Sequence, residues 1–295
     1  MESLDAIQRR IGTTEDLESV VRTMKALAAV NIRQYERAVE ALGDYRRSIE
    51  LGLQIVLQES PRASARATEA PRRRGGFIVF GSDQGMCGPL NDRIVRHALD
   101  EVRELDLDDR HSRFLAVGGR VASRLAEAGR PLEGEVRLPA SIPAIANQVR
   151  EILFAVEDWQ SRHQVDLLVL FYSRHLSRSS YRPATEHLLP LDERWLRSLR
   201  EREWEGRGLP SFSMEAGALF PALIRRHLFI GIYRAFAESL ASENASRLAS
   251  MRRAEQNIRD RLGELRQQYH QQRQLAVTSE LLDIVSAFEA LDTED

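Results

Sequence analysis

Two long stretches, one at each end of the chain, carry apolar residues at steps of three and four. In the first, residues 3–58, the steps follow a heptad and no proline occurs, which predicts one helix with a single apolar face. At a rise of about 1.5 Å per residue, this helix is about 80 Å long. Glu18, Lys25 and Arg46 interrupt the apolar face. The apolar or small positions on it are Leu4, Ile7, Ile11, Thr14, Val21, Ala28, Ile32, Tyr35, Val39, Leu42, Ile49, Leu53 and Val56.

The second stretch, residues 215–291, repeats this spacing and predicts a helix of about 110 Å. Neither stretch has enough apolar surface to be stable as a lone helix. We therefore expect the two to pair antiparallel, with the residues between them inserted as a separate domain. The positions on the expected face of the second helix are Leu223, Ile230, Tyr233, Ala237, Leu240, Asn244, Leu248, Met251, Ile258, Leu262, Leu265, Tyr269, Ala276, Leu281, Val285 and Phe288.

The middle of the chain has a different pattern. Short apolar runs, typical of buried strands, lie at 76–80, 114–117 and 165–172, and residues 185–191 add a candidate edge strand. Helical stretches separate the runs, at 90–105, 121–128 and 143–163. Alternating strands and helices predict a Rossmann-like domain with a largely parallel sheet. The expected fold class is therefore α/β, with two long terminal helices in an antiparallel coiled coil around the inserted domain.

These patterns divide the chain into five parts. We expect an N-terminal helix in 1–58, a linker in 59–75, the α/β domain in 76–191, a connector in 192–214 and a C-terminal helix in 215–295. The linker is rich in alanine, serine, arginine and proline, and it cannot bury enough surface to order itself. Its arginines suit either a solvated linker or contact with nucleic acid or lipid, and a solvated linker is the simpler interpretation.

Composition narrows the class of protein. Hydrophobic residues make up 43% and charged residues 29%, so we expect neither disorder nor a membrane-embedded chain. The net charge of -2 excludes a generally basic nucleic-acid binder. The single cysteine, Cys87, excludes an intrachain disulfide and a cysteine zinc site. An acidic start without an apolar signal segment favours a cytoplasmic protein.

A glycine-bearing turn at residues 81–91 follows the first predicted strand and precedes a helix. Turns of this kind can hold a phosphate on their backbone amides. This one lacks the common phosphate-binding motifs, and Asp83 would repel a phosphate, so we expect a structural turn. The seven histidines are scattered and offer no nucleophile–base pair. We therefore expect no catalytic residue, no cofactor and no metal site.

Several segments resemble the gamma subunit of F-type ATP synthases. Residues 82–88, Ser-Asp-Gln-Gly-Met-Cys-Gly, are similar to that family's Ser-Asp-Arg-Gly-Leu-Cys-Gly turn. Residues 233–247, with Met251, Ala254 and Asn257 after them, resemble its C-terminal helix, and residues 273–280 resemble its Arg-Gln-x-x-Ile-Thr-x-Glu segment. Residues 23–29 and Arg33 fit its N-terminal helix. The matches follow the family's order along nearly the whole chain.

The chain also departs from the family pattern. Val30-Asn31 stand where the family has serine or alanine followed by lysine, Gln84 replaces an arginine, Pro89 a glycine, and Ala287-Phe288 a glycine-alanine pair. These changes concern details of rotor contacts and indicate a divergent branch, such as the alternative sodium-pumping F-type ATPases. Ion choice in this family lies in the membrane ring. The coupling ion, the direction of operation, the ring size and the role of the linker therefore stay open.

The resemblance implies a non-catalytic subunit, the rotor shaft in the central stalk of an ATP synthase. Its partners would be the alpha and beta subunits of the catalytic hexamer, the epsilon subunit and the c-subunit membrane ring, with no nucleic acid. It would be peripheral, at the cytoplasmic face of a bacterial plasma membrane. For the contact residues on the two helices, the alternative is an ordinary solvated face. The residues expected to contact the hexamer are Met24, Lys25, Arg273, Gln274, Thr278 and Glu280.

Two other functions fit part of the pattern. The α/β domain alone would suit a nucleotide-binding enzyme, and the long helices would suit a coiled-coil adaptor or chaperone that grips clients between its arms. The adaptor interpretation leaves the central domain unexplained. Incubation with alpha and beta subunits separates the three, because only a rotor shaft assembles at one copy per three pairs.

Overall fold

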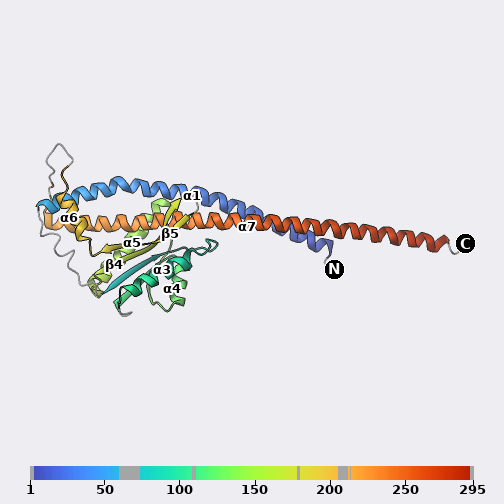
Figure 1. Ribbon diagram of the computed structural model, residues 1–295, viewed down its shortest axis with the longest axis horizontal. Coiled ribbons are helices and arrows are strands. Elements are labelled where there is room, and N and C mark those ends of the chain that lie inside the picture. Colours follow the sequence, from blue (N-terminus) through green and yellow to red (C-terminus); the bar gives the residue numbers. More distant parts are fainter. Residues whose placement is uncertain are drawn as a thin grey trace. The chain divides into compact units, whose positions relative to one another are not determined.

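The computed structural model describes residues 3–59, 74–107, 111–177, 180–204, 212 and 214–292. The helices are α1 (Leu4–Glu59), α3 (Leu90–Glu104), α4 (Gly119–Glu127), α5 (Ile142–His163), α6 (Glu193–Glu201) and α7 (Ala216–Asp292). The strands are β1 (Gly75–Phe80), β2 (Ser112–Val117), β3 (Leu132–Val136), β4 (Leu167–Ser177) and β5 (Ser180–Leu189). The chain divides into two compact units: unit 1, Met1–Leu27 with Leu248–Asp295, and unit 2, Ala28–Arg247. Helices α1 and α7 each contribute to both units (Figure 1).

Unit 2 is built on a five-stranded sheet in the order β3-β2-β1-β4-β5. β1 pairs parallel with β2 and β4, and β3 pairs parallel with β2. β5 runs antiparallel to β4 as an edge strand. The three central strands contain the apolar runs 77–80, 114–117 and 167–172, whose side chains are buried on both faces, as expected for a parallel sheet. The predicted α/β domain, with a largely parallel sheet and an additional edge strand, is therefore confirmed.

Helices cover both faces of this sheet (Figure 1). On one face, Phe80 and Tyr172 pack with Val149 of α5 and Phe236 of α7 in a single apolar cluster. On the other, Phe77 and Phe171 pack with residues of α3 and α4. A third cluster joins the end of α1 to α6 and the start of α7. Unit 2 thus contains the inserted domain together with the adjoining halves of both long helices.

The sequence pattern missed two elements of unit 2. Strand β3 has the sequence Leu-Glu-Gly-Glu-Val and alternating burial at a sheet edge, so it shows no apolar run. Helix α6 lies in the segment expected to be a connector, and it buries only Leu196 and Leu199. Asp192 caps it by accepting a hydrogen bond from the Arg194 amide at 2.8 Å. The segment expected to be a connector thus contains a helix, because two buried leucines and one cap suffice for a helix that packs on an existing core.

The two long helices begin and end within one residue of the predicted limits. At the start of α1, the Ser3 hydroxyl oxygen accepts a hydrogen bond from the Ala6 amide. Within unit 2, the side chains of Asn31 and Asn244 contact each other at 3.4 Å. The expected linker, apart from its two ends, lies outside the described residues.

In unit 1 the helices pair antiparallel along a heptad seam. Ion pairs join them at Glu15–Arg266, Glu18–Arg259 and Lys25–Glu255, so the partner number falls as the α1 number rises. Seam positions are buried or half-buried, and the side chains between them are mostly exposed. On α1 the seam positions of unit 1 are Leu4, Ile7, Ile11, Thr14, Glu18, Val21 and Lys25. On α7 they are Leu248, Met251, Glu255, Ile258, Leu262, Leu265, Tyr269, Gln272 and Ala276.

Candidate functional site

The candidate site begins where the seam of unit 1 ends. Every side chain of α7 from Val277 to Val285 is exposed, and we call these residues the bare stretch. Helix α1 begins at Leu4, and Glu15 already pairs with Arg266 about eleven residues before the bare stretch. Helix α1 therefore does not reach the bare stretch, and α7 continues beyond the start of α1 (Figure 1).

The bare stretch is apolar as well as exposed. Leu281, Leu282, Ile284 and Val285 are each between 51% and 60% exposed. Single exposed apolar residues are common on protein surfaces, but a contiguous group marks a surface that another molecule covers. This part of α7 therefore has the properties of a binding surface for another protein.

The contact residues predicted on α7 all lie at or next to the bare stretch. Arg273, Gln274, Thr278 and Glu280 are exposed. The Thr278 hydroxyl donates a hydrogen bond to the Gln274 carbonyl at 2.8 Å, one turn back along the helix. The side chains of Arg273, Gln274 and Glu280 form no hydrogen bond or ion pair with a described residue, so their polar groups are available to another molecule.

The two contact residues predicted on α1 lie differently. Met24 is half-buried beside the seam. Lys25 occupies a seam position, and its Nζ lies 2.5 Å from Glu255 Oε2 of α7. The Lys25 side chain is 30% exposed and that of Glu255 only 8%. The charge of Lys25 is therefore paired inside the seam, and its contact with the hexamer stays a prediction.

Several basic groups surround Glu255. Arg259 contacts its other oxygen at 2.8 Å and also lies 3.5 Å from Glu18, which in turn pairs with Arg22. The hydrogen bond from Lys25 lowers the pKa of the Glu255 carboxyl, and the positive charges of Arg259, Lys25 and Arg22 lower it further against the opposing effect of desolvation. The seam therefore holds an ionised carboxylate among cations.

The glycine-bearing turn is a structural element of unit 2. Asp83 accepts hydrogen bonds from the Gly119 amide at 2.9 Å and the Leu138 amide at 3.0 Å, so both of its oxygens are occupied. Gly118, with φ of 105°, approaches the Ser82 backbone so closely that a Cβ would lie 2.8 Å from it. These contacts tie the ends of β1, β2 and β3 together. The amide of Gly119 at the start of α4 donates to a carboxylate of the chain itself, so this amide is not available to a phosphate.

The segment of α7 that resembles the family's C-terminal helix attaches α7 to unit 2 through buried polar groups. Ser246 donates a hydrogen bond to the Cys87 carbonyl at 2.5 Å. Ser242 donates to the Ser173 carbonyl at 2.8 Å, at the point where β4 meets α7. The serines recur at helical spacing on one face, and this periodicity was the signal that sequence reasoning did not use.

A buried ion pair stands next to these serines. Glu243 Oε1 lies 2.6 Å from Arg247 Nη2, and both side chains are almost fully buried. Burial raises the pKa of the Glu243 carboxyl, although the charge of Arg247 and its hydrogen bond oppose the rise. Glu243 and Arg247 are therefore paired with each other inside the core.

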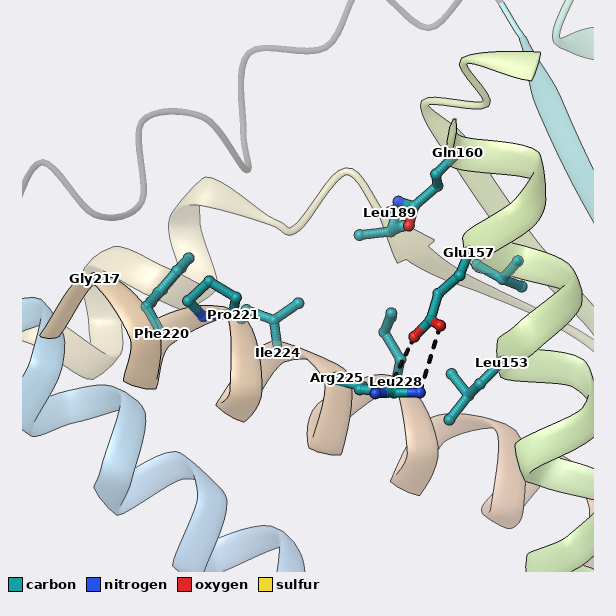
Figure 2. Close-up of a pocket in the computed structure, with 11 residues that line it drawn as sticks. Leu153, Glu157, Gln160, Leu189, Gly217, Phe220, Pro221, Ile224, Arg225 and Leu228 are labelled. Carbon is teal, nitrogen blue, oxygen red and sulfur yellow. Dashed lines mark hydrogen bonds and ion pairs between the residues drawn. The ribbon is translucent and has the colours of Figure 1, made fainter. Parts of the chain in front are cut away.

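Unit 2 also has a cavity of about 590 Å³ between α5 and the first turns of α7 (Figure 2). Leu153, Phe220 and Leu228 contribute to its apolar lining. The Arg225 guanidinium pairs with Glu157 across it at 3.0 Å. Sequence reasoning did not find this cavity, because its walls come from helices distant in the chain.

No described helix is long and apolar enough to cross a membrane. In the described part of the chain, histidine, cysteine, aspartate and glutamate nowhere gather in a group of three that could hold a metal ion.

Solved structures share this fold. A chain of the Euglena gracilis mitochondrial ATP synthase, from a structure of OSCP, F1 and c-ring, aligns with a TM-score of 0.60, 17% identity, and 98% of this chain and 94% of that one covered. A chain from the central stalk and c-ring of the Tetrahymena thermophila enzyme aligns with a TM-score of 0.58, 19% identity, and 80% and 99% coverage. At these identities the likeness establishes the fold.

Sequence relatives extend the likeness to the family. The ATP synthase gamma chain of Polynucleobacter necessarius is 26% identical over 294 residues, which cover 99% of this chain and 100% of the relative. That of Acaryochloris marina is 28% identical over 318 residues, with the same two coverages. The sequence model of the ATP synthase family matches residues 3–291. The chain therefore belongs to the ATP synthase family, in which its full-length relatives are gamma chains.

Proposed function

We propose that this chain is the central rotor shaft, the gamma subunit, of an F-type ATP synthase. It couples ion flow through a membrane ring to ATP synthesis or hydrolysis in a hexamer of alpha and beta subunits, and performs no bond chemistry itself. The bare stretch of α7 is the observation that carries the proposal, since its apolar side chains are exposed and α1 does not extend over them. Other subunits that surround this part of α7 would cover these side chains.

The mechanism is differential binding. An asymmetric shaft touches three otherwise equivalent catalytic subunits differently, and so stabilises a different conformation in each. Rotation moves these preferences around the ring. Ion flow supplies about 2.3 kcal/mol per charge per 100 mV, so several ions are needed for each ATP.

The partners follow from the resemblance and from the similar proteins. The Euglena structure includes OSCP, F1 and c-ring, and the Tetrahymena structure includes the central stalk with the c-ring. We expect this chain to bind the alpha and beta subunits, an epsilon subunit and a c-subunit ring. It would then be a peripheral subunit at the cytoplasmic face of a bacterial plasma membrane.

Within this function, the exposed residues at the end of α7 would contact the catalytic subunits. Arg273, Gln274 and Glu280 have charged or amide groups that no described residue engages, and Thr278 stands on the same part of the helix. Met24 would contribute from α1. Lys25 would act through its ion pair with Glu255 rather than as a free charge.

Reconstitution tests the proposal. The chain is mixed with alpha and beta subunits of a related enzyme, and the mass of the complex is measured by native mass spectrometry. We expect one copy per three alpha–beta pairs. The double substitution Leu281→Ser with Leu282→Ser should weaken the complex, whereas Phe154→Ser, at a residue of α5 that is 63% exposed, should not. A chain that stays free, or binds equally well with both changes, is not a shaft held by the bare stretch.

The nucleotide-binding alternative has its own test. Because the Gly119 and Leu138 amides both donate to Asp83, these two groups are not available to a phosphate. Titration calorimetry of the isolated chain with magnesium-ATP should give no stoichiometric heat. A micromolar signal with one site per chain would contradict the non-catalytic assignment.

A further inference from the structure

Unit 2 has a further cavity, of about 450 Å³, between its halves of α1 and α7. Strand β5 and helix α6 each contribute one residue to its wall, Glu186 and Trp195. A glycine of each long helix also lines it, Gly43 on α1 and Gly231 on α7. Two helix positions without side chains therefore face this space.

The two glycines differ in what packs against them. At Gly231 a Cβ would lie 2.7 Å from the Leu188 side chain, so the close packing of β5 on α7 requires glycine there. At Gly43 a Cβ would meet nothing within 4 Å. The space beside Gly43 is therefore free for another molecule.

Two carboxylates of α1 at this cavity lack a hydrogen bond within the described chain. Glu50 is mostly buried, with a side chain 19% exposed. Its nearest basic atoms are Arg46 Nε at 3.6 Å and Arg202 Nη1 at 3.8 Å, which are too distant for normal hydrogen bonds. Glu40 forms no hydrogen bond or ion pair with a described residue. Both carboxylates can therefore accept hydrogen bonds from a molecule in the cavity.

An aromatic pair lies at the same cavity. The rings of Trp195 and His227 stack with centroids 4.6 Å apart, and His227 forms no hydrogen bond with a described residue. Burial lowers the pKa of the His227 imidazole, which keeps the ring neutral at pH 7. A neutral imidazole has one ring nitrogen that accepts a hydrogen bond. The pair thus adds a further acceptor and an aromatic face.

Negative charge exceeds positive charge in the lining. Its carboxylates are Glu40, Glu50, Glu186 and Glu238, and its guanidinium groups are those of Arg46 and Arg234. Arg234 is shared, at 2.6 Å from Glu186 and 3.9 Å from Glu238, and Arg174 approaches Glu238 from outside the lining at 3.5 Å. Desolvation raises the pKa of the Glu238 carboxyl although both arginines lower it. The chain itself therefore compensates these carboxylates incompletely.

We propose that this cavity binds a small organic cation, with an ammonium or guanidinium group on a short alkyl chain. The cation donates hydrogen bonds to Glu40, Glu50 and His227, and its charge is attracted to the face of Trp195. The volume lies in the range of small-molecule sites, about 300–1,000 Å³. An anion would be repelled by the carboxylates. The inference concerns unit 2 alone and does not depend on the proposed function.

Titration of the full chain with agmatine tests the proposal, because agmatine has an ammonium and a guanidinium group on one alkyl chain. Calorimetry and tryptophan fluorescence, at physiological ionic strength, measure the binding. All three tryptophans lie in unit 2, and Trp195 is at the cavity. We expect saturation at one site per chain. Butanol, which has the same alkyl chain without a charge, should not bind.

Two variants locate the site. Gly43→Leu fills the cavity and should weaken agmatine binding at least about tenfold, which corresponds to about 1.4 kcal/mol. Leucine favours a helix more than glycine does, and the space is open, so this variant should fold. The matched control is Gly12→Leu, at a position of α1 in unit 1 where a Cβ also meets nothing within 4 Å. Glu50→Gln keeps the shape and removes one charge, and should also weaken binding about tenfold.

A second ligand distinguishes the source of the cation. A blocked tripeptide with arginine between two glycines represents a side chain of a neighbouring protein, whereas agmatine represents a free amine. Tighter binding of the peptide assigns the site to a protein side chain, and tighter binding of agmatine assigns it to a free cation. The proposal is overturned if neither ligand saturates a site, or if Gly43→Leu and Glu50→Gln bind as the parent does. Either result leaves the assembly with alpha and beta subunits untouched.

Discussion

Units 1 and 2 use the same two helices in different ways. In unit 2 the helices lie against a sheet and fill its face with large apolar side chains such as Phe236, which packs edge-on against Phe80 at 5.0 Å. In unit 1 they pair only with each other, along a seam that includes glutamate, lysine, threonine and glutamine. The apolar residues of unit 1 are instead frequent on its outside, at Leu17, Leu27 and the bare stretch.

The contrast indicates where each unit obtains its stability. Burial of apolar area stabilises a fold by about 25 cal/mol per Å², so unit 2 can rely on its own core. Unit 1 buries little and exposes apolar area that a partner can cover. It is therefore suited to being held by other subunits, and unit 2 to folding around the sheet.

The largest expected effect lies in the core of unit 2. Phe236→Ala should lower the free energy of unfolding by about 3–5 kcal/mol, because a fully buried ring leaves a cavity. Urea unfolding monitored by tryptophan fluorescence measures it. Phe154→Ala, which removes an exposed ring from α5, is the matched control and should cost almost nothing. Equal effects of the two changes would mean that the sheet is not the stable part of the chain.

A smaller effect is expected in the seam of unit 1. Leu265→Ala should weaken the helix pairing by about 2 kcal/mol, at the low end for a buried leucine because the flanks of the seam are open. The tryptophan signal of unit 2 should not change, while helix content measured by circular dichroism should melt earlier. Leu282→Ala, the same change at a residue that is 60% exposed, should leave the free chain unaffected and weaken only the assembled complex.

Acid should affect unit 1 through Glu255. Because the folded chain lowers the pKa of this carboxyl below its ordinary value of 4.5, its ionisation stabilises the pairing above pH 4.5 and this contribution is lost as the pH falls further. The melting temperature of the helix content, measured by circular dichroism, should therefore decline in this acid range. Glu255→Gln should show a flatter decline over the same range. Identical profiles would assign the acid sensitivity to other carboxyls.

The smallest effect on stability is expected at the end of α7. Thr278→Ala with Glu280→Ala should leave unfolding and assembly unchanged, because both residues are exposed in the free chain. Steady-state ATP turnover of the assembled complex should fall, since these residues are proposed to contact the catalytic subunits. The control is Gln268→Ala, at an exposed position nine residues before the bare stretch. If the double variant turns over ATP as fast as the unsubstituted complex, both residues belong to an ordinary solvated surface.

Much of the fold could be predicted from the pattern of residues. The long helices and the central strands carry regular apolar spacing, and their predicted limits agree closely with α1, α7, β1 and β2. Strand β3 and helix α6 could not be found in this way, because each buries only one or two side chains against a core built by other segments. The bare stretch was predicted only in part. The spacing placed some of its residues on one face of a helix, but it did not indicate that α1 would fail to reach them.

The sequence by itself determined the periodicity of the helices, the alternation of the α/β domain and the segments that resemble the gamma family. These are local properties, written in the order of neighbouring residues. The tertiary structure decided which polar groups are satisfied within the chain. Lys25 is separated from Glu255 by 230 residues, and Asp83 from Leu138 by 55. The charge of Lys25 is paired and both oxygens of Asp83 accept hydrogen bonds, because burial and pairing depend on segments that only the fold brings together.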